Sequence, residues 1–111
     1  MNWLNGFKYR RIACVLSSST KPLTDYPVRV EVRYGSGSMI DNCVYLEGKC
    51  QPDFSDVIIV DSDGVILAPK KDNCWIEEKV NGSHMIVWFK VPYIPKKPKK
   101  TVIYVYFGND S

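Results

Sequence analysis

Apolar and polar residues alternate along most of this chain with a period of two, which is typical of β-strands that bury one face. No window of about 11 residues places apolar side chains at a helical spacing. Runs rich in β-branched and aromatic residues recur between clusters of Gly, Pro, Asn and Asp, which mark turns. The pattern therefore predicts an all-β domain.

Eight short strands account for this pattern. Two of them flank the turn from Asp61 to Gly64, and the others cover residues 7–16, 26–34, 44–46, 74–80, 84–91 and 101–107. Eight short strands with regular turns are typical of an antiparallel β-sandwich of the jelly-roll type. The length suits one domain, so we expect residues 1–111 to form a single β-sandwich module, and the terminal "GNDS" has the composition of a linker to another part of a larger protein.

Asn81-Gly82 predicts a tight hairpin within residues 74–91, because Asn-Gly tolerates the two positive φ angles of a type I′ turn. A two-residue turn places Trp75 opposite Trp88. Side chains then alternate between two faces. The predicted core face holds Cys74, Ile76, Glu78, Val80, Met85, Val87, Phe89 and Val91, and the other face holds Trp75, Glu77, Lys79, His84, Ile86, Trp88 and Lys90.

The face with the two tryptophans has two interpretations. If another segment covers it, the rings form a second small core, and a cross-strand aromatic pair stabilises a sheet by ~0.2 to 1 kcal/mol. If it is open, the indoles offer flat apolar platforms on which sugar rings can stack, since large exposed apolar patches usually mark binding sites. Should the last strand join the same sheet, Tyr104 and Tyr106 would extend this platform.

Charge singles out no partner. Fifteen Lys and Arg against twelve Asp and Glu give +3, and four of the basic residues belong to one predicted loop, "KKPKK". A nucleic-acid-binding domain usually has a cluster of basic residues together with a recognisable binding motif, and this sequence shows neither. We therefore expect no nucleic-acid partner. There is no run of about 18 apolar residues, so no segment is predicted to insert into a membrane.

Catalytic motifs are missing from the sequence. The lone histidine, His84, has no serine and acid in a recognisable motif, and no Gly-rich phosphate loop occurs. The carboxylate pairs Asp53/Asp56 and Asp61/Asp63 belong to turns, where acids favour turn formation. We therefore expect no enzymatic activity and no cofactor. "DSDG" is only a fragment of a calcium loop and is interpreted as a β-turn, whereas a structural calcium ion elsewhere is left open because jelly-roll binding modules often carry one.

Cys14, Cys43, Cys50 and Cys74 form an even set that permits three pairings. The short C-x6-C spacing favours Cys43 with Cys50, which leaves Cys14 with Cys74. Zinc is the less favoured alternative because C-x2-C knuckles are missing, and free buried thiols rank between the two. Oxidised cysteines would indicate an extracellular or cell-surface location, or a hyperthermophile.

Six segments occur in a recognisable order: "W…FKYRRIACVL", "LTDYPVRVEV", "DFSDVIIVDSDGVILAP", "CWIEEKV", "MIVWFKVPYIP" and "TVIYVYFGN". In order and spacing they resemble the family called domain of unknown function 2341, from Trp3 to Asn109. The resemblance implies a jelly-roll module of the lectin and carbohydrate-binding type, repeated or appended in secreted or surface proteins of archaea and bacteria, without catalytic residues. Where that family commonly has Arg and Phe after "DFSD", this chain has Val57, Ile58 and Ile59.

These observations predict a non-catalytic, monomeric carbohydrate-binding module for a polysaccharide or oligosaccharide. The alternative is a structural or adhesion module of a cell-surface or secreted protein. In the first interpretation Trp75 and Trp88 stack on sugar rings, and Glu77 and Lys79 form hydrogen bonds with sugar hydroxyls. His84, Tyr104 and Tyr106 are further contacts.

Overall fold

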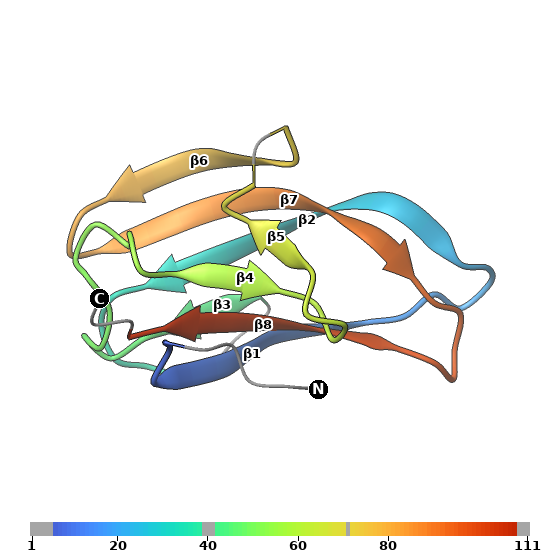
Figure 1. The fold of residues 1–111 in the computed structure, drawn as a ribbon, viewed down its shortest axis with the longest axis horizontal. Helices are drawn as coiled ribbons and strands as arrows, with labels where there is room; N and C mark the ends of the chain where they lie inside the picture. Colours follow the sequence, from blue (N-terminus) through green and yellow to red (C-terminus); the bar gives the residue numbers. More distant parts are fainter. Residues whose placement is uncertain (1–5, 39–41, 71, 109–111) are drawn as a thin grey trace.

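Eight β-strands make up the computed structural model, which describes residues 6–38, 42–70 and 72–108 (Figure 1). No helix occurs among these residues, and consequently none that could cross a membrane. The strands are β1 (Tyr9–Leu16), β2 (Leu23–Arg33), β3 (Cys43–Tyr45), β4 (Ile58–Val60), β5 (Ile66–Ala68), β6 (Cys74–Val80), β7 (His84–Ile94) and β8 (Thr101–Phe107).

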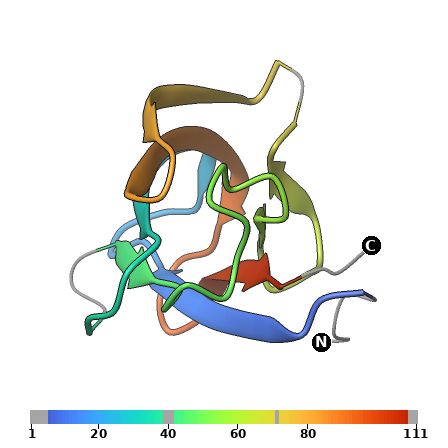
Figure 2. The ribbon, with the colours of Figure 1, turned by 90° about the vertical axis from the view of Figure 1, so that its left-hand side faces the viewer.

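The strands form two four-stranded sheets with the orders β1-β8-β4-β5 and β3-β2-β7-β6. Seen along the strands, the sheets enclose a common interior (Figure 2). The predicted β-sandwich is therefore confirmed. β1 pairs with β8 and β2 with β7, both antiparallel, which is the nesting of a rolled-up hairpin. β3 is parallel to β2, however, so the second sheet is not antiparallel throughout, and the jelly-roll subtype stays a prediction.

The interior is built by the alternating apolar positions of the longest strands. Each of these strands points every second side chain inward, where removal of apolar surface from water stabilises the fold. The buried, inward-facing residues of β2, β7 and β8 include Val28, Val30, Val32, Val87, Phe89, Val91, Ile103, Val105 and Phe107. The predicted core face of the hairpin is thus confirmed on β7.

The turn between β6 and β7 differs from the predicted type I′ turn. Val80 pairs with His84, so three residues form the loop. Gly82 has a φ of 73°, and the backbone N–H of Ser83 donates to the carbonyl oxygen of Val80 at 3.0 Å, as in a type II turn. The N–H of Gly82 donates to the carbonyl oxygen of Pro52 at 2.8 Å, which ties this turn to a neighbouring loop.

A β-bulge between Ile76 and Glu78 takes up the extra residue of the turn. Trp75 consequently pairs with Trp88 as predicted, because the register is restored on the far side of the bulge. Between the bulge and the turn the faces are exchanged. Lys79 pairs with a core-facing residue of β7 and points to the inner side of the sheet.

Candidate functional site

The two tryptophans lie on the outer face of the second sheet, at its β6 edge. Their rings are stacked, with centroids 5.8 Å apart and an angle of 2° between the planes. Trp75 is 48% exposed and Trp88 is partly buried. The stack covers part of the Trp75 ring, and about half of the residue stays exposed at the edge strand. The rings therefore do not form a second closed core.

Polar groups hold the stack in place. The indole N–H of Trp88 donates to Oε1 of Glu77 at 2.7 Å, and Nε of Arg29 lies 3.4 Å from the same oxygen. Arg29 reaches this point because it pairs with Trp88 across β2 and β7. The hydrogen bond from Trp88, and then that from Arg29, lower the pKa of the Glu77 carboxyl. The carboxylate therefore stays anionic at neutral pH beside the rings.

The contact between Trp88 and Glu77 gives a pH signature. Because the folded-state pKa of Glu77 is depressed, its contribution to stability is present at neutral pH and is lost as the pH falls through that pKa. We expect the Trp88 indole ¹H–¹⁵N resonance to titrate with a midpoint below the ordinary pKa of a glutamate. The Glu77→Gln variant should remove this titration, and a midpoint at or above the ordinary value would contradict the contact.

His84 lies on the same outer face, at the turn end of β7. Its Nδ1 is 2.9 Å from the hydroxyl oxygen of Ser83, and its Nε2 is hydrogen-bonded to Glu78. Its side chain is mostly buried by these neighbours. The structure thus places His84 beside the tryptophan face, as the sequence predicts, with both ring nitrogens already engaged.

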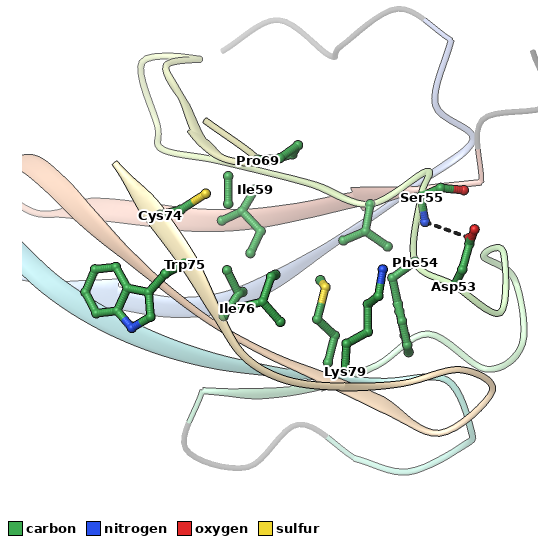
Figure 3. Close-up of a pocket in the computed structure, with 13 residues that line it drawn as sticks. Asp53, Phe54, Ser55, Ile59, Pro69, Cys74, Trp75, Ile76 and Lys79 are labelled. Carbon is green, nitrogen blue, oxygen red and sulfur yellow. Dashed lines mark hydrogen bonds between the residues drawn. The ribbon is translucent and has the colours of Figure 1, made fainter. Parts of the chain in front are cut away.

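The predicted position of Lys79 among the tryptophans is wrong. The bulge turns its side chain to the opposite face of β6, where it enters a cleft between the sheets (Figure 3). The sequence contains a signal for this change. Glu77, Glu78 and Lys79 are three consecutive polar residues, and they interrupt the alternation that a regular strand would keep.

Tyr104 and Tyr106 also lie elsewhere than predicted. β8 pairs with β1 and β4 in the first sheet, so both tyrosines are on the outer face of the sheet that does not carry the tryptophans. The guanidinium of Arg10 lies 4.4 Å from the centroid of the Tyr104 ring, and Tyr106 is fully buried, with the Phe7 ring against it. These tyrosines therefore cannot extend the tryptophan platform.

The predicted pairing of Cys14 with Cys74 is wrong. β1 is the edge strand of the first sheet and β6 is the edge strand of the second, on opposite sides of the sandwich (Figure 2). A disulfide needs Cα atoms no more than about 7 Å apart. The Sγ atom of Cys74 instead lies 3.1 Å from the backbone nitrogen of Lys70.

The predicted pairing of Cys43 with Cys50 is not formed either. Cys50 is buried in the core, whereas Cys43 alternates with the core residue Val44 on β3 and so faces outward. All four cysteines are free thiols, and burial raises the pKa of the Cys14 and Cys50 thiols to about 11. Among the described residues no three His, Cys, Asp or Glu side chains gather as a metal site would require.

Two parts of this region were not singled out by the sequence. Arg29 is one of several outward-facing charges on β2, and only the pairing of β2 with β7 brings it to Trp88. The other part is the cleft on the inner side of β6, with a volume of about 430 Å³. It depends on how the two sheet edges diverge, which local periodicity does not report.

The two packed sheets, with a partly exposed aromatic pair at the β6 edge, define this chain as a β-sandwich module. The family model of the domain of unknown function DUF2341 matches residues 53–111, just over half of the chain. This chain belongs to that family. The match contains β4 to β8 and hence both tryptophans of the pair. No curated protein and no solved structure matches the chain.

Proposed function

We propose that this domain is a non-catalytic carbohydrate-binding module that holds polysaccharide at the aromatic edge, defined as Trp75, Trp88, Glu77 and Arg29. The observation that carries the proposal is the half-exposed ring of Trp75, which is fixed by stacking on Trp88. A sugar ring has one face of C–H groups that packs well on an indole. A ring that is already fixed loses little conformational freedom when the ligand binds.

The polar groups of the aromatic edge suit sugar hydroxyls. Glu77 stays ionised because its pKa is lowered, so its carboxylate accepts hydrogen bonds from hydroxyls next to the stacked ring. The Arg29 guanidinium has five N–H donors, of which the contact to Glu77 uses one. His84 lies on the same face, but Ser83 and Glu78 engage both of its ring nitrogens, so it offers no free hydrogen-bonding group to a glycan.

The same geometry argues for binding without catalysis. A glycosidase needs a carboxylic acid of raised pKa opposite a second carboxylate. Glu77, the carboxylate bonded to the ring pair, has a lowered pKa because Trp88 and Arg29 donate to it. A group held in the anionic state in this way suits a hydrogen-bond acceptor better than a proton donor.

An extracellular or cell-surface location is part of the proposal and rests on the resemblance to modules of secreted proteins. The free thiols supply no support for it. The alternative is a structural or adhesion module, in which a neighbouring domain would cover Trp75. The exposed fraction of 48% favours the binding role, because a buried ring cannot stack on a ligand.

Affinity electrophoresis on a panel of soluble polysaccharides tests the proposal. We expect at least one polysaccharide to retard the native domain in a concentration-dependent way, while a non-binding reference protein in the same gel keeps its mobility. Unchanged mobility throughout the panel, together with no retention on insoluble glycans, would favour the structural alternative.

A further inference from the structure

The inner side of β6 borders a cleft that adjoins the aromatic edge at Trp75. β6 and β7 form one wall, and β4, β5 and the loop at residues 53–57 form the other (Figure 3). The volume is about 430 Å³, within the range of small-molecule sites. Its lining is mainly apolar and includes Phe54, Val57, Ile59, Pro69, Met85 and Val87.

The cleft is open because the two sheets end at different places. β5, the last strand of the first sheet, packs against β7 and has only three residues, so it leaves the inner face of β6 uncovered. Ile76 shows the result. It pairs with the buried Val87 and faces inward, yet it is 50% exposed. Apolar surface exposed inside a concave site favours an apolar ligand, because binding removes that surface from water.

One cation lies at the mouth of the cleft. The bulge brings the Lys79 side chain in, and its amine extends toward the loop that carries Asp53 and Phe54, while the Trp75 indole points away on the other side of β6 (Figure 3). Asp53 is held by Ser55, whose backbone N–H donates to Oδ1 at 3.0 Å. Within the described ranges, Lys79 takes part in none of the ion pairs. Hydrogen bonds from Ser55, and then the charge of Lys79, lower the pKa of the nearby Asp53 carboxyl. An ammonium group has three N–H donors, so Lys79 keeps donors for a second anion.

We propose that this cleft binds the aliphatic chain of an amphiphile whose carboxylate pairs with Lys79. The chemical class is a medium-chain alkyl carboxylate, with the methylenes along Ile76, Met85 and Val87 and the charged end at the mouth. Trp75 also borders this cleft, but its indole projects to the opposite face of β6, so the proposal does not rest on carbohydrate binding.

Isothermal titration calorimetry with hexanoate, octanoate and decanoate below their micelle concentrations tests the site. Each added methylene should strengthen binding about fourfold until the cleft is full. Octanol lacks the charge and should bind about threefold to fivefold more weakly than octanoate, because an exposed ion pair contributes little. Lys79→Gln should remove this preference for the carboxylate and leave the dependence on chain length.

Two aspartate variants on β6 form a matched pair. Ile76 faces the cleft, whereas Val80, 46% exposed, pairs with His84 on the outer face. We expect Ile76→Asp to weaken octanoate binding at least about tenfold, since it places a carboxylate beside the chain, and Val80→Asp to bind as the wild type. Equal losses in the two variants, or no saturable binding by the wild type, would overturn the proposal. If the Ile76→Asp variant does not fold, the Lys79→Gln variant decides. Loss of its preference for octanoate over octanol supports the site, and an unchanged preference contradicts it.

Discussion

Replacing Trp75 by alanine is expected to weaken retention on a bound polysaccharide at least about thirtyfold, the effect of removing a central aromatic residue from a recognition surface. The ring is 48% exposed at the edge of the sheet, so its removal takes away the platform and little of the core. The lost aromatic pair costs about 0.5–1.5 kcal/mol. The melting temperature should therefore fall by only about 2–7 °C.

Tyr93→Ala is the matched control for this prediction. Tyr93 is an exposed aromatic residue of β7, 54% accessible, and lies near the strand end remote from the turn. This variant should be retained as the wild type is. If Trp75→Ala and Tyr93→Ala lose equal affinity, binding is a general property of exposed aromatic residues. If Trp75→Ala unfolds the domain, the ring is structural and the alternative function holds.

Replacing Phe89 by alanine is expected to lower the free energy of unfolding by about 3–5 kcal/mol, which is the usual cost of removing a large aromatic side chain from a core. Phe89 is 0% exposed and lies in β7, between Val28 of β2 and Cys74 of β6. Such a loss is a large fraction of the stability of a domain of this size. Urea unfolding followed by circular dichroism measures it.

The Phe89 prediction has a matched control variant and a numerical limit that would contradict it. Phe89→Leu keeps most of the buried apolar volume and should cost considerably less than Phe89→Ala. A loss below about 1 kcal/mol for Phe89→Ala would mean that β7 does not face a packed interior, and the two-sheet arrangement would then need revision.

Local pattern was sufficient for the strands and for the inward-facing positions of β2, β7 and β8. The alternation in β2, β7 and β8 identified the residues that are buried, because a side-chain period of two needs no knowledge of the partner strand. The pairing of Trp75 with Trp88 was predicted correctly although the turn is one residue longer than expected. The bulge compensates for the longer turn, so two deviations from ideal geometry cancel at the tryptophans.

The sequence could not show which strands pair with one another across long distances in the chain. β8 joins β1 and β4, which moves Tyr104 and Tyr106 away from the tryptophans. Cys14 and Cys74 both have core-side surroundings, but the order of the strands separates them across the sandwich. Strand order is decided by packing between segments distant in the sequence, and alternation within one strand contains no information about it.

The sequence predicted the central residues of the candidate site correctly but not the residues around them. Trp75, Trp88 and Glu77 lie together as expected, since all three belong to one hairpin. Lys79 was assigned to the wrong face because the bulge exchanges the faces near the turn. Arg29 joins the site from another strand, so only the sheet pairing shows it.

The most direct test of the aromatic edge is a titration of the domain, labelled with ¹⁵N, with an oligosaccharide of the polysaccharide that retards it. The indole N–H resonances of Trp75 and Trp88 are followed, and the variants Trp75→Phe and Trp88→Phe distinguish them from each other and from Trp3. We expect the Trp75 resonance to shift progressively and to saturate, with smaller shifts at Trp88, whose N–H is held by Glu77. Saturable binding that leaves the Trp75 resonance unchanged would contradict the proposed site.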